Sequence, residues 1–232
     1  MCPHAALEAP IPDRATAGKA LARLLSAYRQ RRDVLVLALP RGGVPIAYEI
    51  AMALDVRLDL LLVRKLGVPW QAELAMGAIA SNSVQVLNED VIASCHVSRA
   101  AIAAVVAQET RELLRRTHAY RGERPLPALR GQQLILVDDG VATGASMRAA
   151  IKAARQQEPA RIVLAVPVAA ADSVAQLQAE VDEIVCPLVP DMLAAIGYWY
   201  AAFPQVSDGE VRSLLGLAWQ RPCEQGPTGE AD

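Results

Sequence analysis

The chain has 232 residues, of which 53% are hydrophobic and 21% are charged, and its formal net charge is −2. This length and composition predict a globular protein with one main domain over residues 1–220. The weak negative charge, with no run of Lys or Arg longer than two residues, excludes a broad nucleic-acid-binding surface. No apolar run is long enough for a membrane span and no signal-peptide core opens the chain, so we expect a cytoplasmic protein without a membrane partner. Reduced thiols are expected because no C-x-x-C spacing links the cysteines, which are Cys2, Cys95, Cys186 and Cys223.

The first half of the chain alternates helical and strand patterns. Apolar residues at helical spacing predict an amphipathic helix over residues 13–32. The uninterrupted apolar run 34–39 predicts a buried strand, and Pro45 is expected to begin a helix that ends near Leu54. A second strand is predicted over residues 58–63. The stretch from Leu66 to Gln71 shows no periodicity, so we expect a mobile loop there.

The second half continues this alternation. A hairpin is predicted from residues 76–80 and 84–87, followed by a long helix capped by Ser98. The basic end of that helix is expected to be a solvated face, with a second phosphate site as the alternative; its residues are Arg111, Arg115, Arg116 and Arg121. A buried strand is predicted over 134–137 and further strands over 162–166 and 183–186, with helices beginning at Met147 and near Asp172. The pattern predicts an α/β fold whose mostly parallel sheet has 34–39 and 134–137 as central neighbours. The Gly/Pro/Glu-rich tail 221–232 is expected to be disordered.

Two adjacent carboxylates, Asp138 and Asp139, follow the buried strand 134–137. Carboxylates are good acceptors for the vicinal hydroxyls of a sugar. The residues up to Ser146 supply small side chains, hydroxyls and backbone N–H groups at a helix N-terminus, which together favour a bound phosphate. The alternative is an ordinary strand-to-helix turn capped by Ser146, but a cap does not explain two adjacent Asp residues.

This stretch, V-D-D-G-V-A-T-G-A-S, resembles the phosphoribosyl-pyrophosphate (PRPP) motif of type I phosphoribosyltransferases. The resemblance implies that Asp138 and Asp139 bind the ribose hydroxyls. The residues that would wrap the 5′-phosphate are Ala142, Thr143, Gly144, Ala145 and Ser146. It also implies a type I phosphoribosyltransferase-like fold, with a twisted, mostly parallel sheet flanked by helices, an antiparallel edge strand and a small hood. The hairpin after Met76 would supply the edge strand, and the chain ends would supply the hood.

The resemblance extends to cationic residues that would bind pyrophosphate. Arg41, Gly42 and Gly43 match the pyrophosphate loop of related enzymes, although an exposed Arg on a simple turn is the alternative. The pair Arg64-Lys65 resembles one at the base of a loop that closes over the reaction, with a surface pair as the alternative. Catalytic roles are implied for Arg64, Lys65, Asp138 and Asp139. Mg²⁺ would be held mainly by PRPP and water, without a separate protein metal site.

The sequence thus predicts a Mg²⁺-dependent phosphoribosyltransferase that transfers ribose 5-phosphate from PRPP to a nitrogen nucleophile, such as a nucleobase or related heterocycle, and releases pyrophosphate. The whole-chain pattern, including L-P-R-G-G-V-P and E-L-A-M-G-A-I, resembles bacterial members of this family whose acceptor is unsettled. Ala142 stands where 6-oxopurine enzymes carry Asp, which argues against hypoxanthine or guanine. A non-catalytic PRPP-binding regulator is the alternative, although Arg41 and Arg64-Lys65 favour the enzyme.

Two features leave alternatives open. Glu73 could stabilise a cationic transition state or be a solvated loop residue. The late aromatic cluster could stack on a base or pack the C-terminal helices onto the sheet, and packing is favoured for at least two of its members, which are Tyr198, Trp199, Tyr200 and Phe203. The acceptor and the oligomeric state, with a homodimer allowed, are not decided by the sequence.

Overall fold

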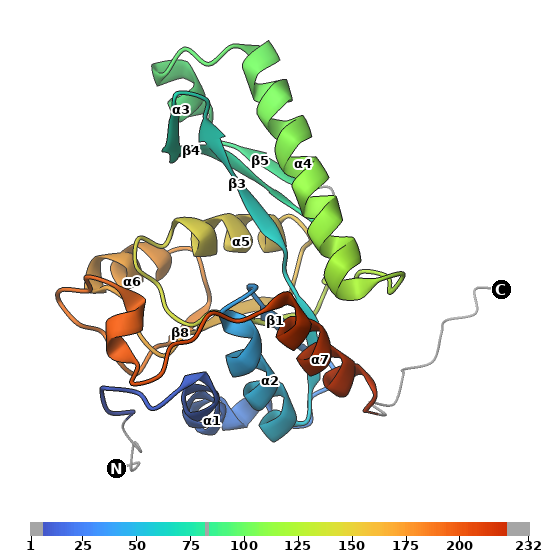
Figure 1. Cartoon of the computed structure of the whole chain (residues 1–232), viewed down its shortest axis with the longest axis vertical. Coiled ribbons are helices and arrows are strands. Elements are labelled where there is room, and N and C mark those ends of the chain that lie inside the picture. The colour runs from blue at the N-terminus through green and yellow to red at the C-terminus, as the bar shows by residue number, and fades with distance from the viewer. Residues whose placement is uncertain (1–6, 82–83, 222–232) are drawn as a thin grey trace.

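A five-stranded parallel sheet forms the centre of the computed structural model, which describes residues 7–81 and 84–221 (Figure 1). Its strands lie in the order β2, β1, β6, β7, β8. Their bounds are β1 Val34–Ala38, β2 Arg57–Leu60, β6 Gln133–Val137, β7 Arg161–Ala165 and β8 Glu183–Val185. β1 and β6 pair in parallel, from Val34 opposite Gln133 to Ala38 opposite Val137. The predicted parallel sheet and its two central neighbours are therefore confirmed.

Helices cover both faces of this sheet, as Figure 1 shows. One face packs against α1 (Arg14–Leu24), α2 (Gly43–Leu54) and α7 (Asp208–Trp219), and the other against α5 (Ala145–Arg155) and α6 (Ala171–Leu177). Successive residues of β1 alternate between the two cores, because side chains along a strand point to opposite faces. Val34 and Val36 belong to the first core, and Leu35 and Leu37 to the second. Burial on both sides explains why the strand reads as an unbroken apolar run.

A second, antiparallel sheet projects above the first. It contains β3 (Val63–Val68), β4 (Gln71–Ala80) and β5 (Gln85–Leu87). Helices α3 (Glu89–Ser94) and α4 (Arg99–Arg121) pack beside it, and α5 lies between the two sheets (Figure 1). The projection therefore comes from the middle of the chain, whereas α1 and α7 at the ends pack against α2.

Two sequence predictions for this region need correction. The expected mobile loop from Leu66 to Gln71 is a β3–β4 hairpin in which Leu66 and Val68 are fully buried and Pro69 and Trp70 form the turn. The β4–β5 hairpin is confirmed, but it belongs to the second sheet and not to an edge of the first. Both edge strands of the main sheet, β2 and β8, run parallel to their neighbours.

The helix ends follow local capping chemistry. Asp13 caps α1 and Ser98 caps α4 by accepting backbone N–H bonds, from Thr16 and Ala101 respectively, and the cap at Ser98 confirms the prediction. The first helix is shorter than expected: it ends at Leu24 and continues as the 3₁₀ turn η1 (Ser26–Tyr28). A second 3₁₀ turn, η2 (Ile196–Trp199), precedes α7. None of the helices in the described ranges is long and apolar enough to cross a membrane.

The basic end of α4 only partly matches its prediction. Arg115 is exposed and Arg116 is half-buried, and they pair with Glu112 at 2.8 and 2.7 Å. Arg116 also lines the cavity described below, so the second-phosphate-site alternative stays open for it. Arg121, in contrast, is buried and donates to the Asp59 carboxylate of β2. Burial raises the pKa of Asp59 above its ordinary value, and the positive charge of Arg121 acts against that rise. The solvated-face prediction is therefore wrong for Arg121, which ties α4 to the main sheet.

The remaining sequence predictions concern the cysteines and the C-terminal tail. Cys95 and Cys186 are free thiols, whereas Cys2 and Cys223 lie outside the described residues. The predicted disordered tail also lies outside them from residue 222 onward.

Candidate functional site

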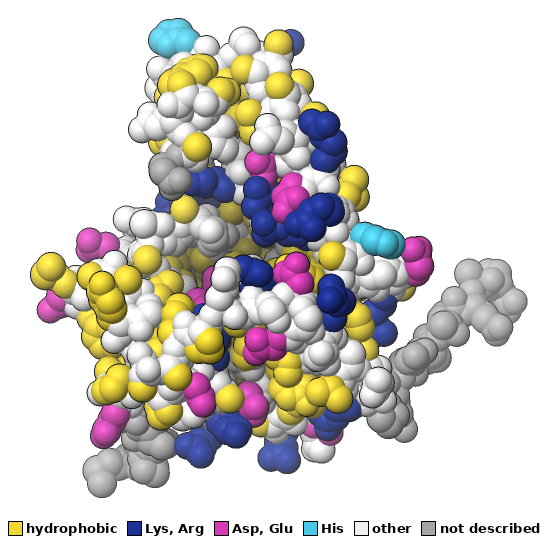
Figure 2. Space-filling model, viewed as in Figure 1, with side chains coloured by type: hydrophobic (Ala, Val, Ile, Leu, Met, Phe, Trp, Pro, Cys, Tyr) yellow, Lys and Arg dark blue, Asp and Glu magenta, His cyan; other side chains and the backbone are white. Residues whose placement is uncertain are grey.

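A cavity of about 650 Å³ lies between the carboxyl ends of the main-sheet strands and the second sheet. Leu39 and Leu61 line it from below, and β3 and α4 contribute its upper wall. Figure 2 shows this hollow, with Lys and Arg side chains gathered beside it. Carboxyl ends of strands in open α/β sheets are the usual place for ligands. The cavity thus lies where the sequence predicts the site.

Asp138 lines this cavity, and its Oδ1 accepts a hydrogen bond from the backbone N–H of Asp139 at 2.8 Å. Burial raises the pKa of the Asp138 carboxyl well above its ordinary value, and the negative charge of Asp139 adds to the rise. The N–H of Asp139 and the positive charge of Arg14 act in the opposite direction. Asp138 is therefore a half-buried carboxyl group that faces the cavity.

Asp139 has different surroundings from its neighbour. Arg14 of α1 donates to its Oδ2 from Nε at 3.0 Å and from Nη2 at 2.7 Å. The side chain of Asp139 is only 14% exposed, and among the described residues it is not one of those that line the cavity. The sequence predicts one shared role for the two carboxylates, whereas the structure gives each its own partners.

The stretch that is predicted to bind phosphate lies at the N-terminus of α5. Gly144 precedes the helix with φ of +72°, a left-handed conformation that favours glycine. No side chain among the described residues caps α5, so its first N–H groups lack helical partners. Ser146 is exposed in the first turn and lines the cavity, which rules out the alternative that it is the N-cap. Thr143 is exposed beside it, Ala145 begins the helix, and Ala142 accepts a bond from Ser173 Oγ at 2.5 Å.

The loop that carries Arg41, Gly42 and Gly43 lies directly against the acidic pair. A Cβ at Gly42 would lie 2.0 Å from Oδ2 of Asp139, and one at Gly43 would lie 2.5 Å from the carbonyl oxygen of Val137. Only glycines allow this approach. The glycine loop after β1 therefore packs directly against the chain at the end of β6. The Arg41 guanidinium lies 3.5 Å from the carboxylate of Asp208 on α7.

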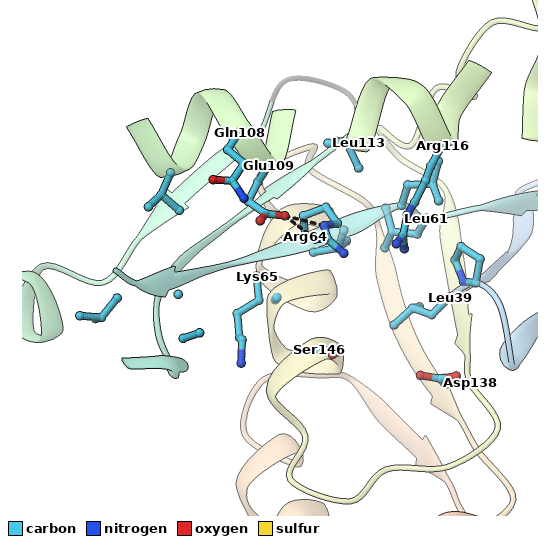
Figure 3. Close-up of a pocket in the computed structure, with 18 of the residues that line it drawn as sticks. Leu39, Leu61, Arg64, Lys65, Gln108, Glu109, Leu113, Arg116, Asp138 and Ser146 are labelled. Carbon is cyan, nitrogen blue, oxygen red and sulfur yellow. Dashed lines mark hydrogen bonds and ion pairs between the residues drawn. The ribbon is translucent and has the colours of Figure 1, made fainter. Parts of the chain in front are cut away.

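Arg64 and Lys65 line the cavity from β3, not from a loop. Arg64 forms an ion pair with Glu109 of α4 at 2.6 Å. Figure 3 shows Arg64 directed toward Glu109, and Lys65 directed away from α4 toward the part of the cavity that contains Ser146. This divergence follows from the strand, along which neighbouring side chains point to opposite sides. The two cations therefore have separate surroundings.

Several residues at the site could not be found from sequence patterns. The Tyr200 hydroxyl donates to the carbonyl oxygen of Asp139 at 2.7 Å, and burial raises the pKa of Tyr200. Phe203 lies under Arg14, whose guanidinium carbon is 3.8 Å from the ring centroid. Arg14 and Asp139 are 125 residues apart, so no local spacing links them.

The aromatic cluster is mainly a packing feature. Tyr200 is buried and Trp199 packs against the core, which confirms packing for two of the four residues. Tyr198 is 81% exposed. The side chain of Glu73 lies outside what the structure describes, so its role stays a prediction.

Comparisons with known proteins agree with this architecture. Residues 10–198 match the family described as the phosphoribosyl transferase domain. Two Mycobacterium tuberculosis proteins that carry a phosphoribosyl transferase name, from strains CDC 1551 / Oshkosh and H37Rv, are each 45% identical over 214 residues. The match covers 92% of this chain and 48% of each relative, so the chain spans about half the length of these curated relatives. The crystal structure of TT1426 from Thermus thermophilus is 40% identical, with a TM-score of 0.79 over 88% of this chain and 96% of that one. The chain therefore belongs to the phosphoribosyl transferase domain family.

Proposed function

We propose that this protein is a Mg²⁺-dependent phosphoribosyltransferase that transfers ribose 5-phosphate from PRPP to a nitrogen nucleophile, a nucleobase or related heterocycle, with release of pyrophosphate. One observation carries the proposal: a single cavity brings together Asp138, the uncapped N-terminus of α5 with Ser146, and the cation Lys65. These groups complement a sugar that has a phosphate at each end. The nucleotide-metabolism role, the cytoplasmic location and a homodimer stay predictions.

The ribose 5-phosphate end of PRPP would bind at the motif after β6. The N–H groups of α5 and the hydroxyls of Thr143 and Ser146 would donate to the 5′-phosphate, where the helix dipole also favours negative charge. The ribose hydroxyls would donate to the carboxylate of Asp138 in the cavity. This arrangement would fix C1 of the ribose in the open space below β3.

The pyrophosphate end would lie toward Arg41, the N–H groups of Gly42 and Gly43, and the cations of β3. These groups would stabilise negative charge as the bond from C1 to pyrophosphate breaks and the nitrogen nucleophile attacks. β3 and α4 cover the cavity, which would limit access of water to the cationic sugar.

Magnesium fits this site as an ion carried by the substrate. Within residues 7–81 and 84–221 no group of three or more His, Cys, Asp or Glu side chains could hold a metal. Phosphate oxygens and water are the ligands that Mg²⁺ prefers, so its ligands would come mainly from PRPP and solvent. The bound ion would neutralise part of the charge on pyrophosphate.

The proposal is tested by incubating the protein with PRPP, Mg²⁺ and a panel of heterocyclic bases and by measuring pyrophosphate release. We expect release that requires one class of base and that is lost in Asp138→Asn. In the same assay, Ser146→Ala should weaken ribose 5-phosphate as a competitor, whereas Arg41→Ala should leave that competitor unaffected and weaken pyrophosphate. Equal damage to both ligands by Arg41→Ala would contradict the two subsites.

The regulator alternative also has an observation in its favour. Arg41 and Arg64, two cations proposed for pyrophosphate, face the carboxylates of Asp208 and Glu109. Calorimetry that shows PRPP binding, together with no pyrophosphate release for any base, would establish a PRPP-binding regulator in place of the enzyme.

A further inference from the structure

Asp139 is held by a buried ion pair that joins the motif after β6 to the start of α1. Arg14 is the first residue of α1, and its Nε and Nη2 both donate to the same oxygen, Oδ2 of Asp139. The Arg14 side chain is 9% exposed and that of Asp139 is 14% exposed. Two charge-assisted bonds at low exposure fix the direction of this carboxylate.

The Arg14 guanidinium is itself fixed by the segment before α7. Its Nη1 donates to the carbonyl oxygen of Pro204 at 2.7 Å, and its carbon lies 3.8 Å from the centroid of Phe203. From the same segment, the Tyr200 hydroxyl donates to the carbonyl oxygen of Asp139 at 2.7 Å. Both the carboxylate and the backbone of Asp139 are therefore held by residues distant in sequence.

Another side of Asp139 faces the glycine loop. A Cβ at Gly42 would lie 2.0 Å from Oδ2, so the backbone of Gly42 runs close to this carboxylate. Oδ2 of Asp139 therefore lies between the Arg14 guanidinium and the glycine loop. The carboxylate that faces the cavity is that of Asp138, which accepts the N–H of Asp139 at 2.8 Å.

We propose that Arg14 is a positioning residue of the phosphoribosyl site: it fixes Asp139 and, through the peptide that joins the two residues, it fixes the Asp138 carboxylate where the ribose hydroxyls of PRPP bind. The inference rests on the proposed function. Asp139 is fixed by a direct ion pair, and Asp138 is fixed through the backbone that it shares with Asp139. Arg14 also places a positive charge beside two adjacent carboxylates, which lessens their mutual repulsion.

Electrostatics give this role a measurable signature. Burial is the main cause of the raised pKa of Asp138, and the negative charge of Asp139 is the second cause. The positive charge of Arg14 lowers this pKa. The other charged groups that line the cavity are Arg64, Lys65, Glu109 and Arg116. Removal of the positive charge of Arg14 should therefore raise the pKa of Asp138 further. Binding that needs the ionised carboxylate would then require a higher pH.

The test is Arg14→Gln, with ribose 5-phosphate affinity measured by calorimetry across pH. We expect affinity near neutral pH to fall about tenfold to a hundredfold, as for the loss of charge-assisted bonds, and the midpoint of the pH profile to move upward. Arg14→Lys keeps the charge without the planar fork, so it should retain the wild-type midpoint and recover part of the affinity. It also serves as the second variant if the Gln substitution impairs folding.

Arg121→Gln is the matched control, because it too removes a buried arginine that is paired with an aspartate, Asp59, but Arg121 does not line the cavity. It should leave the midpoint unchanged. An equal shift in both variants, or wild-type affinity and midpoint in Arg14→Gln, would overturn the positioning role. Carbon-13 NMR titration of the Asp138 carboxyl without ligand separates this inference from the proposed function. Failure of the wild-type protein to bind ribose 5-phosphate or PRPP rejects the function, whereas an unchanged Asp138 titration in Arg14→Gln rejects the inference.

Discussion

The Asp138 carboxylate is placed where its charge is costly for the fold. It lies half-buried at the end of β6, next to a second carboxylate, and burial and that neighbour raise its pKa. A carboxyl whose pKa is raised by folding stabilises the protein fully only below its ordinary value of 3.8. That contribution is lost as the pH rises through the raised value. At neutral pH the charged form is thus kept at a cost in stability, as is common for groups at functional sites.

We therefore predict that Asp138→Asn weakens PRPP binding by about tenfold to a hundredfold and does not lower stability at pH 7. The neutral amide removes the burial penalty, so the melting temperature should stay level or rise. The gain should shrink as the pH falls toward 3.8, because wild-type Asp138 then becomes neutral as well. Calorimetry and thermal denaturation at several pH values check both parts. A clearly lower melting temperature at pH 7 would contradict this account.

At the scale of single residues, the sequence predicted features whose residues are close together in the chain. The acidic pair and the small-residue turn follow β6 in an order that few other turns share, and one residue of each, Asp138 and Ser146, lines the cavity. Arg14 reads in sequence only as the first residue of a helix, and Tyr200 only as one of several aromatics. Their contacts with Asp139 join positions 125 and 61 residues apart. No periodicity carries information about such pairs.

Among the elements, the second sheet shows where pattern reasoning failed. β3 buries Leu66 and Val68, but its other residues include Arg64, Lys65 and Gly67, so too few apolar positions alternate to signal a strand. The pairing of β3 with β4 also shifts register at Gly67, where a Cβ would lie 2.5 Å from the carbonyl oxygen of Ala72. Because of this irregular pairing and the two-residue turn, the sequence of the stretch lacks a strand pattern and resembles that of a loop. By contrast, the buried runs of β1 and β6 were unambiguous.

A hairpin in place of a loop changes what is expected of Arg64 and Lys65. Arg64 is paired with Glu109, while Lys65 is directed toward the region of Ser146 (Figure 3). If the Lys65 cation stabilises charge as it develops on pyrophosphate, Lys65→Ala should lower kcat more than it raises the KM for PRPP. Arg64→Ala should have the smaller effect on kcat, because its guanidinium is engaged by α4.

Steady-state kinetics of the two single variants check this division, and Glu109→Gln is a useful companion because it leaves both cations in place. Equal losses of kcat in Lys65→Ala and Arg64→Ala would show that the two cations act together. Amide exchange gives a second measurement: the N–H groups of β3 that bond to β4 should be protected even without ligand. Rapid exchange there would restore the mobile loop predicted from sequence.

For the whole molecule, the cavity depends on ties between parts that are far apart in sequence. Arg121 joins the end of α4 to β2, and the indole N–H of Trp219 in α7 donates to the carbonyl oxygen of Leu58 in the same strand at 3.0 Å. Arg124 lies over the Trp219 ring, 4.5 Å from its centroid. These contacts hold the second sheet and α4 above the main sheet. The fold class was predictable because strand order follows from buried runs, but this attachment was not, since it depends on isolated polar side chains.

The last prediction concerns Arg121 and Asp59. Arg121→Met should lower the free energy of unfolding by about 3–5 kcal/mol at neutral pH, because it leaves the Asp59 carboxylate buried without its cation. The double variant Arg121→Met with Asp59→Leu should recover much of this loss, since an apolar pair removes both desolvation penalties. The loss in the single variant should also shrink in acid, because the raised pKa of Asp59 allows the carboxyl to become neutral there.

Urea denaturation at pH 7 and near pH 4 measures these differences, and the m-value shows whether the unfolding transition is unchanged. A single variant as stable as the wild-type protein at pH 7 would mean that Asp59 escapes to solvent when Arg121 is lost.

The double variant also tests whether the ion pair matters for activity. If α4 keeps its place on β2 through apolar contact alone, pyrophosphate release should return together with stability, because neither residue lines the cavity. Recovery of stability without recovery of turnover would instead show that the ion pair sets the position of α4, and with it the distance between the cations of β3 and the motif after β6.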